Sequence, residues 1–501
     1  MKRYTTYFIV CTISIFGLTS CSVNPVTGKK QLSFMSESQE ISIGKESDPA
    51  VIAQFGVYPD SNMQRFIKEK GNLMVAQSHR PSLPFEFRIL DSDVINAFAV
   101  PGGYVYFTRG IMAHFNDEAQ FAGVLGHEIG HITARHSSQQ YTKQMLTQIA
   151  FMGGMLLSEK FRNMSEQAMQ GMQLLFLKFS RDDETESDVL GVKYASAIGY
   201  DAKEMADFFQ TLQRVTQKDG ARIPEFLSTH PDPGNRYNTV KKLATEYQAT
   251  NNLSNLKINR DSYLRMIDGI VYGEDPRQGY LDKNNYVFYQ PEMKFEYPIP
   301  HQWQYQNSPQ AVQAANKEGT AAIILTLSQK KDFSTAATEI LESYKVKNIN
   351  NPFQTKINGI NAYTFEAEEI TQNDPSQPQM TEQEKTQAAA EKLKILFTLY
   401  QYNGAIYVLQ GMCAKKDFTA QKNNFMYAMN GFKALTDPKR INVVPERIKV
   451  VTIANDMTLK DVMIANKIAS DRHEEVAILN GMQQNTIVKK GMLVKMIEKR
   501  L

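Results

Sequence analysis

The stretch Leu125-Gly126-His127-Glu128-Ile129-Gly130-His131 decides what kind of domain the N-terminal half of this chain forms. On a helix, His127 and His131 lie one turn apart on one face, so their ring nitrogens can converge on a single cation. Glu128 follows the first histidine, where its carboxylate can reach a water molecule on that cation. This H-E-x-x-H spacing is typical of two zinc ligands and a general base.

Two glycines in the same stretch argue against a chance match on a solvated helix. Gly126 and Gly130 each cost a helix about 1 kcal/mol relative to alanine, so they indicate that another part of the chain approaches closely. Asn116 or Asp117 can cap this helix, which is then expected to run past His136.

A second charged segment supplies candidates for a third ligand. Residues 180–191 read Ser-Arg-Asp-Asp-Glu-Thr-Glu-Ser-Asp-Val-Leu-Gly, and glutamate on a second helix is one way to complete a zinc site. Glu184 and Asp188 are one turn apart on one face, so the first can bind metal while the second orients a metal-bound histidine or Arg181. Glu186 points elsewhere on this helix. The alternative is an ordinary solvated helix face.

Two further segments flank these helices. Residues 96–106 predict two short strands about a Pro-Gly-Gly turn, and a strand edge beside a metal cleft can pair with an extended peptide. The pairing positions would be Asn96, Ala97, Phe98 and Ala99. An ordinary core hairpin is the alternative. Later in the chain, His230 lies in a stiff Ser-Thr-His-Pro-Asp-Pro turn before the helix that holds Arg236.

Taken together, residues 96–103, 127–136, 180–191 and 228–231 resemble the zinc endopeptidases of peptidase family M48, and the resemblance covers roughly residues 24–270. The resemblance implies one zinc ion with the ligands His127, His131 and Glu184, the general base Glu128 and the supporting residue Asp188. His230 matches a histidine that lies near zinc in some members, where it either fills the fourth position or donates to the oxyanion. We expect His230 or Arg236 to stabilise that oxyanion.

The N-terminus predicts a lipoprotein signal peptide at residues 1–20. Two basic residues precede an apolar stretch, Tyr7–Leu18, that is too short for a comfortable membrane span. The sequence Leu-Thr-Ser-Cys ending at Cys21 resembles a bacterial lipobox, which implies cleavage before Cys21 and its lipidation. Ser22 favours the outer membrane of a Gram-negative cell. A plain secretory signal or a short anchor is the alternative.

Composition bounds the remaining possibilities. The 501 residues are 42% hydrophobic and 10% aromatic, which is ordinary for globular protein and leaves room for two to four domains. A formal charge of +3 gives no case for nucleic acid. Among three cysteines, Cys413 stands alone in an apolar strand pattern, so we expect a buried small hydrophobe and no disulfide framework.

The expected fold class is α+β. A mainly helical zincin-type metalloprotease domain with a small edge-strand sheet would occupy residues 21–270. An α+β accessory domain would follow at 285–435, with hairpins at Asn358-Gly359 and Asn403-Gly404. Residues 440–501 show strand, helix, helix, strand and resemble a degenerate LysM module, which would imply peptidoglycan contact.

The function these features favour is a membrane-anchored periplasmic zinc endopeptidase. Its substrates would be misfolded or misassembled proteins of the cell envelope. A chaperone or binding lipoprotein with secondary proteolysis is one alternative. A peptidoglycan-associated hydrolase is another, and it rests only on the LysM-like module.

Overall fold

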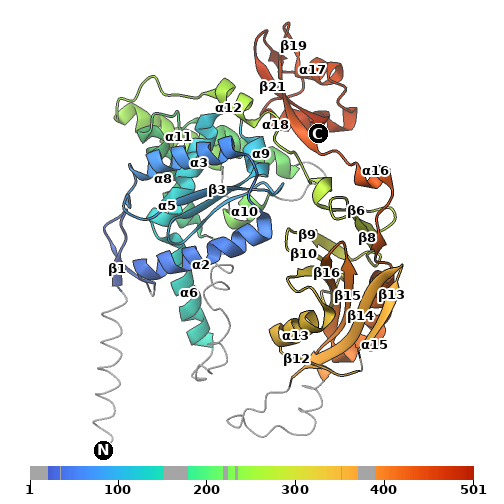
Figure 1. The fold of residues 1–501 in the computed structure, drawn as a ribbon. Helices are drawn as coiled ribbons and strands as arrows, with labels where there is room; N and C mark the ends of the chain where they lie inside the picture. Colours follow the sequence, from blue (N-terminus) through green and yellow to red (C-terminus); the bar gives the residue numbers. More distant parts are fainter. Residues whose placement is uncertain are drawn as a thin grey trace, which may run out of the picture. The chain divides into compact units, whose positions relative to one another are not determined.

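The chain folds into two compact units, the second inserted in the sequence of the first (Figure 1). The first unit contains the residues up to Gly273 and Glu446–Arg500, and the second contains Glu274–Pro445. The structure, a computed structural model, describes residues 21–33, 35–151, 179–217, 224–231, 235–350, 352–370 and 390–500. The predicted signal peptide, residues 1–20, lies outside the described residues.

Helices dominate the N-terminal part of the first unit. They are α2 Glu37–Phe55, α3 Ser61–Val75, α4 Arg109–His114, α5 Glu118–Thr133, α6 His136–Phe151, α8 Arg181–Ala197, α9 Glu204–Gln217, α10 Glu225–Thr229, α11 Arg236–Thr250 and α12 Arg260–Ile267. The strands are β1 Cys21–Val23, β2 Lys30–Leu32, β3 Glu86–Leu90, β4 Ala97–Val100 and β5 Tyr104–Thr108. The last three form one sheet in the order β3-β5-β4, with β4 at its edge. The predicted hairpin at residues 96–106 is therefore confirmed.

This small sheet is buried on both faces. Alternate residues of a strand point to opposite faces, and they join two different apolar clusters. Ala97, Ala99 and Phe107 belong to the large core that contains α5. Phe98 and Tyr106 pack instead with Val51 of α2. The edge strand β4 therefore runs directly beside the helix that carries the H-E-x-x-H motif.

That helix is shorter than the sequence predicts. Asp117 caps α5 by accepting from the backbone N–H of Gln120, as expected. The helix ends at Thr133, however, because Arg135 adopts a left-handed conformation (φ +62°) and α6 begins afresh at His136. The prediction of one helix running past His136 is wrong. A non-glycine residue pays about 1–2 kcal/mol for this conformation, and the ion pair from Arg135 Nε to Glu40 (2.6 Å) offsets it.

The C-terminal residues 446–500 pack into the same core as α5. They comprise β18 Glu446–Thr452, β19 Met457–Thr458, α17 Leu459–Ala465, η4 Ser470–Arg472, α18 His473–Leu479, β20 Ile487–Val488 and β21 Leu493–Lys499. The predicted order of strand, helix, helix, strand is confirmed, with β18 and β21 paired antiparallel. Ile448, Val476 and Val494 share one apolar cluster with Phe121 and Leu125 of α5.

A fully buried lysine ties this tail to the residues before α5. Lys495 lies on β21, and its ammonium donates to the backbone oxygens of Ala113 (2.8 Å) and Phe115 (2.9 Å). Asn480 holds the strand itself, since it exchanges two hydrogen bonds with the Lys495 backbone. The end of α4 is therefore completed by a residue that lies almost 400 positions further along the chain.

The second unit is rich in strands. Its strands are β6 Tyr280–Asp282, β7 Val287–Gln290, β8 Phe295–Pro298, β9 Gln304–Asn307, β10 Ala311–Ala315, β11 Ala321–Ser328, β12 Val346–Asn348, β13 Phe353–Ile357, β14 Ile360–Glu369, β15 Leu393–Tyr402, β16 Ala405–Ala414 and β17 Lys433–Ala434. Its helices are η2 Pro276–Gln278, α13 Phe333–Ser343, η3 Lys415–Asp417, α15 Phe418–Asn430 and α16 Pro438–Ile441. An eight-stranded sheet in the order β12-β14-β15-β16-β11-β10-β9, with β13 on β14, accompanies a four-stranded one.

Several local predictions for this unit are confirmed. Asn358-Gly359 and Asn403-Gly404 are two-residue hairpin loops, with positive φ at every position as a type I′ turn requires. Cys413 is buried on β16. The α+β fold class is likewise confirmed, with a helical N-terminal region followed by a strand-rich one. None of the described helices has the length and apolar character needed to cross a bilayer.

Candidate metal centre

Two glycines let the backbones of α5 and α8 touch. A Cβ atom on Gly126 would lie 2.9 Å from the carbonyl oxygen of Gly191, and one on Gly191 would lie 2.9 Å from that of Gly123. The close approach predicted from the glycines of the motif is confirmed, and α8 is the element that approaches. Because the helices cross here, the acidic face of α8 lies over the histidines of α5.

Four side chains converge at this crossing. His127, His131 and Glu184 meet His230, which comes from the end of α10, and all four are buried. Nε2 of His127 lies 3.0 Å from Nε2 of His131 and 3.5 Å from Oε2 of Glu184. Oε1 of Glu184 is 3.4 Å from Nε2 of His131 and 3.0 Å from Nδ1 of His230. The predicted ligands and His230 therefore form one cluster.

These separations fit a tetrahedral zinc site. Zinc binds histidine nitrogen and carboxylate oxygen at about 2.0–2.2 Å, which sets neighbouring ligand atoms about 3.3 Å apart. With one ligand atom from each residue, the four atoms lie within 4.8 Å of one another. The pairs measured above and the pair His127 Nε2–His230 Nδ1 (3.4 Å) lie 3.0 to 3.5 Å apart, with either oxygen of Glu184 as the partner. The donor set of nitrogen and oxygen atoms also suits zinc. His127, His131, Glu184 and His230 are thus the residues that would hold the ion.

Glu128 is placed beside this cluster with its carboxylate unsatisfied. Both of its oxygens are buried, and neither has a hydrogen-bond partner among the residues that the structure describes. Oε1 lies 3.6 Å from Nε2 of His230. Burial raises the pKa of Glu128 to about 7. A buried carboxylate without a hydrogen-bond partner is costly, and a pKa near neutrality suits a group that takes up and releases a proton.

Asp188 supports His127 from behind. Nδ1 of His127 lies 2.9 Å from Oδ1 of Asp188, so the ring donates to this carboxylate and leaves Nε2 free for a metal. The sequence predicts that Asp188 orients either a metal-bound histidine or Arg181, and in the structure it contacts the histidine, His127. Arg236 also donates two hydrogen bonds to Asp188, from Nε (2.9 Å) and from Nη2 (2.6 Å). Burial raises the pKa of Asp188, but the Arg236 charge and the His127 hydrogen bond outweigh it, so the pKa is lowered overall.

Arg236 contacts two acidic side chains of the cluster, Glu184 and Asp188. Its terminal nitrogen lies 3.2 Å from Oε2 of Glu184, and its guanidinium stacks over the ring of Phe209 at 4.0 Å. The sequence suggested Arg236 as an oxyanion donor. In the structure it bridges two acids, Glu184 and Asp188, which is the geometry of a group that orients ligands.

His230 faces both the ligands and the base. Its ring stacks on Phe226, with centroids 4.5 Å apart, and its Nε2 has no hydrogen-bond partner among the described residues. Burial lowers the pKa of His230, but the charges of Glu184 and Glu128 outweigh it, so the pKa is raised overall. In its neutral form the ring could bind a metal through Nδ1, or its Nε2 could instead donate to a substrate.

Two polar residues at the centre were not assigned a role from the sequence. His136 lies against His131, with their Nδ1 atoms 3.0 Å apart, and Glu186 contacts the far side of His136 at 3.1 Å. On a continuous helix His136 would point about 140° away from His131. The break at Arg135 makes the contact, and the residue pattern carries no signal for that break.

The predicted substrate strand contacts α5, the helix that carries His127 and His131. Asn96 precedes the edge strand β4, and its side-chain oxygen is buried with no partner among the described residues. Ala97, Phe98 and Ala99 lie on β4 itself. Cys21 begins strand β1 at the start of the described chain.

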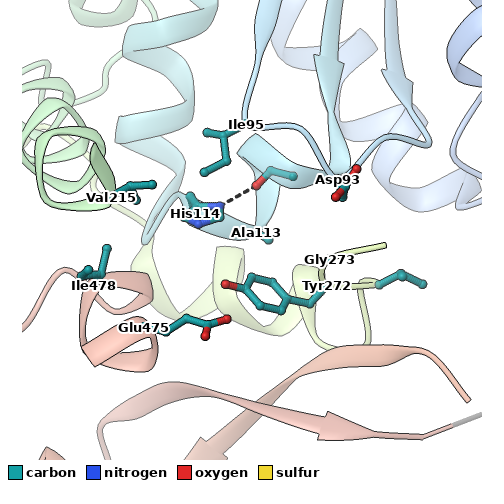
Figure 2. A pocket seen from close by; sticks show the side chains of 11 residues that line it. Asp93, Ile95, Ala113, His114, Val215, Tyr272, Gly273, Glu475 and Ile478 are labelled. Atoms are coloured by element: carbon teal, nitrogen blue, oxygen red, sulfur yellow. Dashed lines mark hydrogen bonds between the residues drawn. The ribbon is translucent and has the colours of Figure 1, made fainter. Parts of the chain in front are cut away.

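A cavity of about 320 Å³ lies in another part of the first unit (Figure 2). Its walls include His114, Tyr272 and Glu475, so it lies between the end of α4 and the C-terminal tail. His114 donates from Nδ1 to the carbonyl of Gly110 (2.7 Å), and burial lowers the pKa of its ring to about 4. The cavity shares no lining residue with the metal cluster.

Comparison with known proteins gives a family match over the residues of the metal cluster and several related proteins. Residues 61–244 match the model of Peptidase family M48. A beta-barrel assembly-enhancing protease of Yersinia pestis is 29% identical over 234 residues, which cover 44% of this chain and 47% of that protein. Its counterpart in Escherichia coli K12 is 27% identical over 235 residues (45% and 48%). The human mitochondrial metalloendopeptidase OMA1 is 24% identical over 247 residues (46% and 47%). The chain spans about half the length of these relatives.

Proposed function

We propose that this protein is a zinc-dependent endopeptidase, because residues 61–244 match the model of Peptidase family M48. The observation that carries the proposal is the buried cluster of four ligand atoms with an unsatisfied carboxylate beside it. Two histidines, a glutamate and a neighbouring general base are the requirements of metal-assisted peptide hydrolysis.

Each residue of the cluster has a distinct task in this reaction. A zinc ion, when bound, polarises the scissile carbonyl and lowers the pKa of water to about 7. Glu128 takes a proton from the attacking water and later delivers it to the leaving amine. Asp188 and Arg236 keep His127 and Glu184 oriented throughout. Strand β4 lies at the edge of its sheet and would hold the substrate as an added strand, with Asn96 to Ala99 as the pairing positions.

His230 has two possible tasks, and its position favours one of them for the resting protein. Its Nδ1 lies 3.0 Å from Oε1 of Glu184 and 3.4 Å from Nε2 of His127, so it could serve as a fourth ligand to a bound zinc ion and would then keep substrate out of the site. Replacement of His230 by alanine should therefore raise the basal rate of peptide cleavage. A fall in kcat with an unchanged KM would instead identify His230 as the oxyanion donor.

The substrates we infer are misfolded or misassembled proteins of a bacterial cell envelope. The relatives from Yersinia pestis and Escherichia coli are named for the assembly of beta-barrels. The lipobox-like sequence ending at Cys21 supports a lipid anchor, a periplasmic location and attachment to the outer membrane. Labelling with a radioactive fatty acid tests the anchor, since Cys21→Ala should abolish incorporation.

Contact of residues 440–501 with peptidoglycan is a separate proposal, supported by the strand, helix, helix, strand order of a LysM-like module. Sedimentation of the full-length protein with purified peptidoglycan tests it. Cosedimentation that survives replacement of the exposed Lys489 and Lys490 by alanine supports glycan binding, and loss in that variant would indicate simple charge attraction. A chain that stays in the supernatant has no such contact.

The decisive experiment measures metal content and peptide cleavage together. Wild-type protein should bind one zinc ion and cleave an unfolded protein such as casein, and a chelator should stop the cleavage. Glu128→Gln should keep the zinc and lose the activity. A chaperone would instead suppress the aggregation of an unfolded protein even when the chelator is present. Suppression of aggregation with chelator therefore distinguishes a chaperone from a metal-dependent peptidase. An active Glu128→Gln protein with bound zinc would overturn the assignment.

A further inference from the structure

His131 has a second ring nitrogen that the metal site does not use. Its Nε2 lies among the ligand atoms, 3.0 Å from Nε2 of His127. Its Nδ1 points away and lies 3.0 Å from Nδ1 of His136. His136 is completely buried, and its own Nε2 lies 3.1 Å from Oε2 of Glu186. The three side chains thus form a continuous line from the metal cluster toward the surface, where the Glu186 side chain is 27% exposed.

The chemistry of imidazole fixes where the protons must lie along this line. To bind a metal, Nε2 of His131 must carry a lone pair, so its proton lies on Nδ1. That N–H can donate to His136 only if Nδ1 of His136 is an acceptor. The proton of His136 then lies on Nε2, where Glu186 accepts it. Only this arrangement satisfies every nitrogen on the line.

We propose that His136 and Glu186 are positioning residues, which hold His131 in the tautomer and ring orientation that bind metal. The inference rests on the proposed metal site and deepens it. His127 receives the same support directly, from Asp188. His131 receives it through an intervening imidazole. The two ligand histidines of one motif are therefore supported by different routes.

The surroundings of His136 are built to hold this contact. Arg135, with its positive φ, turns the chain so that His136 faces back toward α5. Ser187 contacts Nδ1 of His136 from α8 at 3.2 Å. The ring of Phe179 stacks on His131 with centroids 4.0 Å apart, which limits rotation of that ligand to its own plane. Within that plane, the hydrogen bond to His136 decides which nitrogen faces the cluster.

The test measures zinc affinity of the full-length protein by competition with a chromophoric chelator. His136→Phe keeps a ring but removes the acceptor, and Glu186→Ala removes the far carboxylate. Loss of such supporting groups typically weakens metal binding about 10- to 100-fold, and we expect losses in this range, larger for His136→Phe. His136→Asn should restore much of the affinity, because its side-chain oxygen occupies the place of Nδ1. Asp182→Ala removes an exposed acid from the same helix, α8, and should change nothing.

A second readout separates positioning from simple packing. The visible absorption spectrum of the Co²⁺-loaded protein reports the ligand geometry, and it should change in His136→Phe but not in Asp182→Ala. Wild-type affinity in both His136→Phe and Glu186→Ala would overturn the proposal, as would equal losses in His136→Phe and His136→Asn. Glu186→Ala carries the test if His136→Phe does not fold. A wild-type protein that binds no zinc would refute the proposed function itself, which is a different result.

Discussion

Glu128 sets the pH range in which the proposed site can work. It must be ionised to take a proton from water, and burial raises its pKa to about 7. A bound cation adds positive charge beside it and lowers that pKa. We therefore expect kcat/KM to fall as the pH drops, with a midpoint between the usual 4.5 and about 7. A pH profile at saturating zinc measures this, and a rate that rises toward acid would contradict it.

The same carboxylate has the opposite effect on the stability of the metal-free protein. Because the pKa of Glu128 is raised in the folded state, its contribution to folding is present below pH 4.5 and is lost as the pH rises through about 7. Glu128→Gln removes this dependence. The free energy of unfolding of the variant, relative to wild type, should therefore increase between about pH 5 and about pH 8 in the presence of a chelator.

At the level of elements, the crossing of α5 and α8 sets the distance between the proposed ligands of the two helices. Gly191→Ala places a Cβ atom 2.9 Å from the carbonyl of Gly123, which the backbone must relieve by moving. Overpacking of this kind costs roughly 1–3 kcal/mol. Since α8 carries Glu184, we expect weaker zinc binding as well as a lower Tm. Val189→Ala, on the exposed face of α8, is the matched control. Unchanged zinc affinity in Gly191→Ala would show that the site tolerates this shift.

The proposed ligands could be predicted from the sequence because they obey local spacing. The four-residue steps His127–His131 and Glu184–Asp188 are properties of any helix, and the glycines at the crossing are visible as departures from helix propensity. Arg135 is different. Arg135 ends α5 because it pairs with Glu40, on a helix almost a hundred residues earlier. No local sequence pattern predicts a partner at that distance. The contact of His136 with His131 depends on the turn at Arg135, so it could not be predicted from the sequence either.

For the whole molecule, the buried Lys495 offers a direct measure of how far the tail supports the first unit. Lys495→Ala removes two hydrogen bonds to the end of α4 and leaves a cavity, at a cost of roughly 2–5 kcal/mol. Lys495→Met keeps the apolar stem and should cost less, through the unpaired carbonyls of Ala113 and Phe115. Chemical denaturation measures both, with the exposed Lys499→Ala as control. Equal stability of all three variants would show that the tail docks without this lysine.

The tail, residues 446–500, packs with residues far away in the sequence, and a division of the sequence into consecutive domains does not predict this packing. The strands and helices of residues 446–500 follow from alternation and periodicity in that segment alone. Their packing with Phe121 and Leu125 depends on apolar surfaces more than three hundred residues apart. Such pairing is set by the shapes of two surfaces, which an isolated sequence segment does not display.

The insertion of the second unit within the first has a consequence for biosynthesis. A ribosome makes the H-E-x-x-H helix early, but β21 and Lys495, which complete the core around it, emerge only after the whole of Glu274–Pro445. The nascent chain therefore carries the proposed metal ligands long before the first unit can be completed. If the proposed endopeptidase is exported in an unfolded state, its metal site could be completed only after nearly all of the chain has been translocated.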